Sequence, residues 1–188
     1  MDKFFIIANR QKDKELKTAR KVEAYLNSKG KSCILREETS EQKARSNHYT
    51  DVEKIPKDVE CIIVIGGDGT LLQAARDVVN RQIPLLGINM GTLGYLAEID
   101  RSSIDGALNH LMLDEYTIEK RMMLNGKVYH KEELIAEDVA LNDIVIGRDG
   151  PLHVTRFHNY VNGDKHPDYD TGSTAYLKYQ KCDFSGRR

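Results

Sequence analysis

The sequence has little of what marks a nucleic-acid-binding, secreted or membrane-spanning protein. Its 28 lysine and arginine residues are nearly balanced by 29 aspartate and glutamate residues, so no broad basic face argues for nucleic acid. No apolar run approaches the roughly 18 residues that suggest a membrane span. The run near the start, KFFIIA (3–8), is short and no small-residue cleavage site follows it, so we expect a strand there and no signal peptide.

Cysteine is scarce and irregularly placed. The three cysteines, Cys33, Cys61 and Cys182, are odd in number and form no CxxC pair. This argues for free thiols in a reducing cytosol rather than a disulfide framework or a zinc site. The six histidines have no metal-ligand spacing, so we expect them to be surface or core residues and predict no metal site. A soluble cytoplasmic protein is the expectation.

What the chain has instead is an alternation of short apolar runs and amphipathic segments. The apolar runs predict four buried strands at 3–8, 33–36, 61–65 and 83–90. The amphipathic segments predict three helices at 13–30, 70–81 and 102–115. This order predicts an α/β fold with a doubly wound, mostly parallel sheet.

Some details of these elements can also be predicted. The first helix has Leu16, Ala19, Val22 and Leu26 at helical spacing. Gly30 stands at the right place for its C-terminal cap. For the third helix, Ser102 or Ser103 is the expected cap. The polar stretch 37–58 lacks sustained periodicity and is either a mobile functional flap or a linker.

After Glu115 the pattern changes to short strand-like runs broken by Gly, Pro and Asn. The pair Asn125-Gly126 is a strong hairpin signal, so we predict a turn there with strands on either side. We therefore predict an α/β domain at 1–115 and a β-rich domain at 116–188. An antiparallel sandwich of the usual kind needs about 100 residues, so the second domain is expected to be incomplete.

The stretch CIIVIGGDGT (61–70) raises the main chemical question. Glycines between a strand and a helix bring backbone N–H groups up to a phosphate, yet Asp68 stands among them. Aspartate is common in turns and helix caps. Beside phosphates, however, a carboxylate costs energy unless a metal neutralises it or it accepts a proton from the reacting group. Both exceptions describe phosphoryl transfer, so the loop indicates a kinase-like site.

Two better-known phosphate-binding patterns are absent from the sequence. There is no GxxxxGK[ST], and no GxGxxG follows the first predicted strand. A P-loop nucleotidase and a standard dinucleotide-dependent dehydrogenase are therefore disfavoured.

The motifs instead resemble those of NAD kinases. GGDGT (66–70) is similar to a signature shared by NAD kinases, 6-phosphofructokinases and the diacylglycerol and sphingosine lipid kinases. PLLGINMGTLGYLAE (84–98) resembles the second glycine-rich segment of bacterial NAD kinases. Three further segments resemble later parts of that family, in its order: YTIEKRMML (116–124), ALNDIVI (140–146) and TGSTAY (171–176). The resemblance covers about residues 1–163 and then 171–176.

This resemblance implies an α/β nucleotide domain followed by a β-rich domain, with NAD bound between them. It implies transfer of the γ-phosphoryl group of ATP, with Mg²⁺, to the 2′-hydroxyl of the adenosine ribose of NAD. NAD and ATP would be the partners, with no nucleic acid and no membrane, and the full-length family is expected to be homo-oligomeric.

The family's site residues carry over by their motifs. Asp68 matches the general base, and the diphosphate-binding loop corresponds to Gly66, Gly67, Gly69 and Thr70. Tyr95 matches an aromatic residue facing the nucleotide, although it could be ordinary core. The residues matching the NAD-binding positions are Asn142, Asp143, Thr174, Ala175 and Tyr176. Asn142 could instead cap a turn.

The chain departs from the family in its last part. DKHPDYD (164–170) stands where the family has a longer stretch, and LKYQKCDFSGRR (177–188) resembles none of it. We therefore expect a disrupted second domain and a low-activity, truncated form of the enzyme. Two alternatives stay open: a lipid kinase that shares the GGDGT loop, and a non-catalytic remnant that binds nucleotide without turnover.

Overall fold

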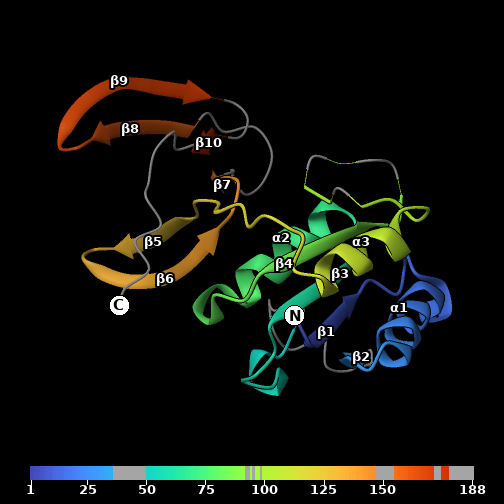
Figure 1. Cartoon of the computed structure of the whole chain (residues 1–188). Coiled ribbons are helices and arrows are strands. Elements are labelled where there is room, and N and C mark those ends of the chain that lie inside the picture. Colours follow the sequence, from blue (N-terminus) through green and yellow to red (C-terminus); the bar gives the residue numbers. More distant parts are fainter. Residues whose placement is uncertain are drawn as a thin grey trace. The chain divides into compact units, whose positions relative to one another are not determined.

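The computed structural model describes residues 1–35, 50–91, 94, 96–97, 99–146, 155–171 and 175–177. It divides into two compact units, Met1–Glu119 and Lys120–Arg188 (Figure 1). Each unit is described by itself.

The first unit is a parallel sheet with helices. Its strands are β1 (Lys3–Ala8), β2 (Ser32–Leu35), β3 (Cys61–Gly66) and β4 (Leu85–Asn89). Its helices are α1 (Lys17–Ser28), α2 (Asp68–Asp77) and α3 (Ile104–Met112), with short 3₁₀ turns at Lys14–Leu16, Val52–Lys54 and Val79–Arg81. The strand order is β2-β1-β3-β4, and every neighbouring pair is parallel.

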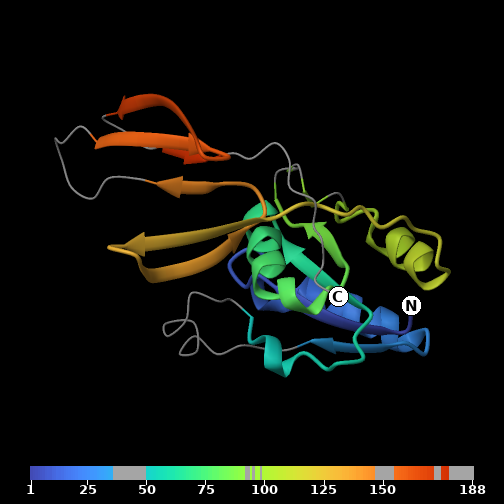
Figure 2. The same ribbon diagram turned by 90° about the vertical axis from the view of Figure 1, so that its left-hand side faces the viewer.

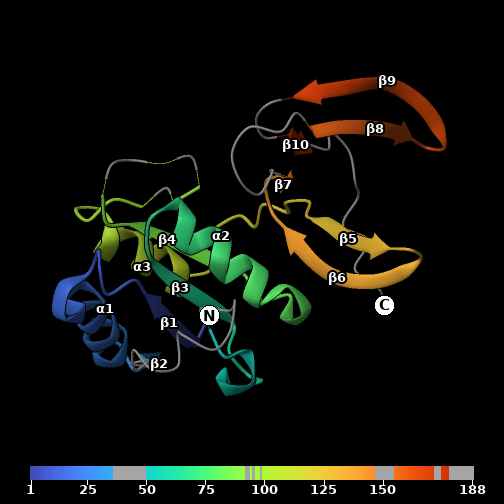
Figure 3. The ribbon, with the colours of Figure 1, turned by 180° about the vertical axis from the view of Figure 1, so that it is seen from behind.

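Both faces of this sheet are covered, which confirms the predicted doubly wound α/β fold. Along β3, Cys61, Ile63 and Ile65 pack into one core with residues of α1 and α3. Ile62 and Val64 alternate with them and join the other core, which includes residues of α2 (Figure 3). A strand covered on both faces reads as an uninterrupted apolar run, which is why β3 was evident in the sequence.

Helix α1 has well-defined ends. At its start, the buried Asp13 carboxylate accepts the N–H groups of Thr18 and Ala19 at 3.0 and 2.9 Å. At its end, Gly30 has φ of +75°, and its N–H donates to the carbonyl of Asn27 at 3.0 Å. The prediction of a glycine cap is confirmed, because this left-handed conformation suits glycine and closes the helix in a Schellman-type turn.

The expected serine cap of α3 is wrong in its chemistry. Ser103 occupies the N-cap position, but its side chain makes no capping hydrogen bond. Asp100 instead closes a turn just before the helix, since its Oδ1 accepts the N–H groups of Ser102 and Ser103 at 2.8 and 2.9 Å. The hydroxyl of Ser102 also donates to Oδ1, at 2.7 Å, and this hydrogen bond is the first cause that lowers the pKa of the Asp100 carboxyl, ahead of the contacts with Ser103.

The described end of the polar stretch 37–58 packs firmly onto the first unit. Ile55 is buried in the same core as α2. The guanidinium of Arg81 donates to the carbonyls of Val52, Ile55 and Pro56 at 2.8–3.1 Å. Residues 50–58 are therefore neither flap nor free linker, and residues 36–49 lie outside the described residues.

The second unit consists of paired antiparallel strands (Figure 2). One hairpin joins β5 (Leu124–His130) to β6 (Glu133–Ala140), and another joins β8 (Thr155–Val161) to β9 (Asp164–Thr171). A third pair joins β7 (Ile144–Ile146) to β10 (Ala175–Leu177).

The predicted hairpin turn at Asn125-Gly126 is wrong. These residues lie inside β5, and the turn is at Lys131-Glu132, whose φ values are 48° and 70°. Residues 116–123, expected as a strand, form neither helix nor strand. A Cβ on Gly126 would meet the side chain of Ile144, so the glycine permits close packing rather than a turn.

A second Asn-Gly pair does form a hairpin turn. Asn162 and Gly163, between β8 and β9, have φ values of 52° and 91°. Positive φ at both central residues is typical of a type I′ turn, which matches the twist of the flanking strands. Local turn preference was therefore right for one Asn-Gly pair and was overridden at the other.

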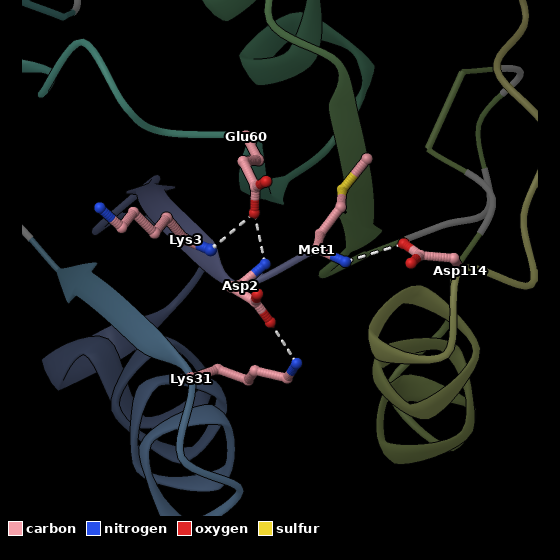
Figure 4. A network of polar contacts seen from close by, with 6 residues as sticks. All are labelled: Met1, Asp2, Lys3, Lys31, Glu60 and Asp114. Carbon is pink, nitrogen blue, oxygen red and sulfur yellow. Dashed lines mark hydrogen bonds and ion pairs between the residues drawn. The ribbon is translucent and has the colours of Figure 1, made fainter.

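Charged groups join the amino end of the chain to neighbouring elements (Figure 4). The amino group of Met1 forms an ion pair with Asp114 at 2.8 Å, just beyond α3. Glu60 accepts the backbone N–H groups of Asp2 and Lys3. Lys31 pairs with the Asp2 carboxylate and lowers its pKa. This cluster lies at the amino ends of β1 and β3.

Several large apolar side chains of the second unit are exposed. Among them are Val128, Tyr129, Leu134, Ile135 and Val145. No helix among the described residues is both long and apolar enough to cross a membrane.

Candidate active site

The sheet order places two loops at one crevice. The chain runs from β1 out to β2 and then back to β3 on the other side of β1. In open α/β sheets, ligands bind outside the carboxyl ends of the strands at such a reversal. The residues there are those that follow β1, from Asn9 to Lys12, and those that follow β3, from Gly67 to Thr70.

Helix α2 begins at Asp68, two residues earlier than predicted. Gly67 is therefore the N-cap, with φ of −137° and ψ of −173°, and Asp68, Gly69 and Thr70 form the first helical turn. The early N–H groups of a helix have no intrahelical acceptor and point out of its positive end. The geometry is that of an anion-binding helix N-terminus.

Close approach, rather than unusual backbone angles, explains the glycines of this loop. Among the described glycines, positive φ occurs at Gly30 and Gly163 and not at Gly66, Gly67 or Gly69. A Cβ on Gly66 would overlap the side chain of Thr70. At Gly69 nothing lies within 4 Å of the Cβ position, so the helix start is open to a ligand on that side.

Asp68 ties the two glycine-rich segments together. Its Oδ1 accepts the backbone N–H groups of Leu96 and Ala97, both at 3.2 Å. A Cβ on Gly94 would overlap this carboxylate, so the second segment approaches it closely. Both contacts fall on the same oxygen, so they hold the carboxyl group in one orientation.

Thr70 joins the loop to β1. Its hydroxyl oxygen accepts the side-chain N–H of Asn9 at 3.2 Å and lies 3.5 Å from the N–H of Gly67. The backbone N–H of Thr70 donates to the carbonyl of Gly67 at 2.9 Å, closing the turn. The hydroxyl is thus engaged in holding the loop.

The end of β4 completes this arrangement. Asn89 is buried, and its side-chain oxygen accepts the N–H of Gly91 at 2.9 Å. The N–H of Met90 donates to the carbonyl of Gly66 at 2.6 Å. The second glycine-rich segment is therefore hydrogen-bonded to the first at two places, here and at Asp68.

A pocket of about 320 Å³ opens beside the loop. Apolar residues of β1 form part of its wall, and the polar part is lined by Asn9, Arg10, Lys12, Thr50, Thr70 and Gln73. Gly69 also lines it, so the pocket adjoins the first turn of α2.

Sequence reasoning missed three residues here: Asn9, Lys12 and Asn89. Asn9 directly follows one predicted strand, Lys12 stands three residues farther on, and Asn89 is the last residue but one of another, so nearness to a strand end was the available signal. By contrast, the thiols of Cys33 and Cys61 are buried and free, as predicted, and burial raises the pKa of each to about 12. They are core groups without nucleophilic character at neutral pH.

The family profile of the ATP-NAD kinase N-terminal domain matches residues 4–116. The chain belongs to the NAD kinase family. That match contains the whole Gly66–Thr70 loop and the second glycine-rich segment.

Similar curated NAD kinases cover nearly all of this chain. The NAD kinase of Lachnospira eligens is 44% identical over an alignment of 185 residues, and the match covers 94% of this chain and 63% of that protein. The NAD kinase of Lachnoclostridium phytofermentans is 41% identical over 94% of this chain and 64% of its own length. The chain thus spans just under two thirds of the length of these relatives.

Solved structures of the NAD kinase family share the fold. Yeast NADH kinase complexed with NADH has a TM-score of 0.71 at 18% identity, covering 92% of this chain and 56% of that one. An NAD kinase from Archaeoglobus fulgidus in complex with ATP has a TM-score of 0.58 at 16% identity, covering 91% and 58%. These matches support neither the lipid-kinase alternative nor an unrelated fold.

The described NAD kinase motif residues of the second unit lie in the β7–β10 pair or directly before it. Asn142 and Asp143 form the turn before β7, Asn142 exposed and Asp143 half-buried. In the β7–β10 ladder, Tyr176 pairs with Val145 and Ala175 with Ile146. The predicted Tyr95 and Thr174 lie outside the described residues.

Proposed function

We propose that this chain carries out the NAD kinase reaction, in which the γ-phosphoryl group of ATP passes to the 2′-hydroxyl of the adenosine ribose of NAD and gives NADP. The observation that carries the proposal is the placement of Asp68. It stands in the first turn of α2 and is held by the N–H groups of Leu96 and Ala97, in a chain of the NAD kinase family.

Asp68 is the proposed general base. It takes the proton of the 2′-hydroxyl while that oxygen attacks the γ-phosphorus and ADP leaves. A base must keep its carboxylate in hydrogen-bond reach of the hydroxyl, and the two N–H bonds to Oδ1 restrict its rotation. This supports a positioned carboxylate rather than a mobile one.

The loop Gly66–Thr70 is the proposed diphosphate site. Backbone N–H groups at the start of α2 supply the donors, and the bare Gly69 leaves room for phosphate oxygens. Because the Thr70 hydroxyl is engaged with Asn9, its role in the proposal is to hold the loop against β1.

We further propose that the two compact units correspond to the nucleotide domain and the β-rich domain expected from the sequence. In this proposal Asn142 and Asp143 hold the adenosine part of NAD, and Thr174, Ala175 and Tyr176 line the dinucleotide pocket. Tyr95 faces the nucleotide. Cytoplasmic location and homo-oligomeric assembly remain predictions.

The metal in this proposal arrives with ATP. The described residues contain no group of three or more His, Cys, Asp or Glu side chains that could hold a metal ion. Mg²⁺ is usually bound through nucleotide phosphates, water and one or two carboxylates, so it would enter this site together with ATP. Bound in that way, Mg²⁺ neutralises phosphate charge, while the chain's own groups position the phosphates and take up the proton.

The test is NADP⁺ formation by the full 188-residue chain from NAD⁺, ATP and Mg²⁺. We expect NADP⁺ to depend on all three and on Asp68, and diacylglycerol to give no phosphorylated product. We expect a low rate, because the exposed apolar side chains of the second unit favour association over a well-ordered pocket. Nucleotide binding without NADP⁺, or phosphorylated diacylglycerol, would contradict the proposal.

A further inference from the structure

Lys12 places an ammonium group against both glycine-rich segments. Its side chain is largely exposed, yet its Nζ occupies the space into which a Cβ on Gly67 would project. The same nitrogen lies 3.9 Å from the Cβ position of Gly91. Glycine at these two positions therefore allows one lysine to approach the backbone after β3 and the backbone after β4.

The backbone of Lys12 is held on both sides. Its N–H and that of Asp13 donate to the carbonyl of Asn9 at 3.0 and 2.8 Å. Asn9 bonds Thr70 through its side chain, and the buried Asp13 caps α1. The start of the lysine side chain is thus fixed relative to the loop, although its outer carbons can rotate.

The charge arrangement is unfavourable without an anion. The N-terminus of α2 carries partial positive charge, and an ammonium group beside it is repelled. Across the described ranges of the first unit, none of the ion pairs formed by lysine side chains involves Lys12. A negatively charged group between Nζ and the first turn of α2 would turn this repulsion into two attractions.

We propose that Lys12 binds a phosphate group of the nucleotide held at the Gly67–Gly69 turn. The inference rests on the proposed function, of which it names a further binding residue. The pocket of about 320 Å³ supports it, since Lys12, Gly69 and Thr70 line the same pocket. Lysine meets phosphate as a point charge on a flexible stem, so Nζ can move aside as phosphate oxygens reach the N–H groups.

The experiment measures equilibrium binding of ATP, NAD⁺, inorganic triphosphate and adenosine to the full chain and its variants. Lys12→Met removes the charge with similar side-chain length, and Lys12→Arg keeps it. Lys14→Met is the matched control, because Lys14 is also exposed, lies two residues away and is not among the side chains nearest to the described glycines of the two segments.

We expect Lys12→Met to weaken binding of at least one phosphate-bearing probe about 10- to 100-fold, the range for a hydrogen bond to a charged group. Adenosine binding should not change. Lys12→Arg should retain most of the affinity, and Lys14→Met all of it. The advantage of the wild type over Lys12→Met should shrink as salt rises, because the contact is exposed.

Equal phosphate affinities in the wild type and Lys12→Met would overturn the inference, as would a wild type that binds none of the probes. The outcome for the proposed function is separate. NADP⁺ formation with unchanged affinities in Lys12→Met would refute only the role of Lys12. A charge-dependent loss of binding in a chain that makes no NADP⁺ would refute only the reaction.

Discussion

Replacing Asp68 in two ways should separate its chemical role from its structural one. Asp68→Asn keeps an oxygen that can accept the N–H groups of Leu96 and Ala97, but it removes the proton acceptor. Asp68→Ala removes both. Asp105→Asn is the control, since Asp105 is an acidic residue in the first turn of α3 and lies outside the site.

The magnitudes follow from the two hydrogen bonds. Loss of a general base costs about 10²–10⁴ in rate, or about 2.7–5.4 kcal/mol of transition-state stabilisation. Asp68→Ala also leaves two N–H groups without their acceptor, one of them on the buried Ala97. The bonds are rather long at 3.2 Å, so we expect about 1–3 kcal/mol of lost stability in total.

Two assays together check this reasoning. NADP⁺ formation should fall about equally in both Asp68 variants, and neither assay should change much in Asp105→Asn. Thermal unfolding should shift little in Asp68→Asn but by several degrees in Asp68→Ala, since 1 kcal/mol corresponds to about 2–4 °C in a chain of this size. Near-normal turnover in Asp68→Asn would refute the assignment of Asp68 as the general base. An unchanged melting temperature in Asp68→Ala would show that the hydrogen bonds from Leu96 and Ala97 to Asp68 do not stabilise the fold.

Three further predictions concern the loop, the hairpin and the core. Gly69→Ala should raise stability by about 0.5–1 kcal/mol and weaken nucleotide binding. In Gly106→Ala, where the space around the Cβ position is equally open, the fold should be stabilised and nucleotide binding should not change. Melting curves and ATP titration test both variants. Changing Lys131-Glu132 to Asn-Gly should raise the unfolding temperature of the second unit, because both residues have positive φ. Burial raises the pKa of Cys61 to about 12 from 9.0, so the unfolded thiol ionises first and this group should lower stability by about 1.4 kcal/mol per pH unit between pH 9 and 12. Because burial raises the pKa of Cys33 to about 12 as well, Cys61→Ala should reduce the slope in thermal melts by the share of one thiol.

Each of these has a result that contradicts it. Unchanged nucleotide affinity in Gly69→Ala would show that no phosphate reaches that side of the helix start. A lower melting temperature with Asn-Gly at 131–132 would show that the hairpin turns elsewhere. A pH slope as steep in Cys61→Ala as in the wild type would assign the alkaline loss of stability to groups other than Cys61.

The fold of the first unit could be predicted because its signals are long and consistent. The run Cys61–Gly66 is buried throughout, and the spacing of Ala19, Val22 and Leu26 on α1 matches one buried face. Failures occurred where a short local signal competed with packing. Asn125-Gly126 has a strong turn preference, but both residues lie within a strand. There the Ile144 side chain packs against Gly126 in the space that a Cβ would fill.

The site residues within continuous sequence motifs could be predicted, but those brought to the site by the pairing of strands could not. The motif GGDGT identified the loop after β3. The helix begins at Asp68, but Gly69 is a poor helix former, so its start was predicted two residues too late. Asn9 and Lys12 were missed because their part in the site depends on β1 lying next to β3. That adjacency is a property of strand order, which neither periodicity nor motif spacing reveals.

The charge cluster at Met1 has a practical consequence for how binding can be measured. Met1, Asp2 and Lys3 lie at the amino ends of parallel strands, while the Gly66–Thr70 loop lies at their carboxyl ends. A six-residue strand separates the two by roughly 20 Å. A chain immobilised on a sensor surface through its amino end would give up the exposed Met1–Asp114 ion pair, which costs at most about 1 kcal/mol. The same attachment would leave the nucleotide loop directed toward the solution, where ligands arrive.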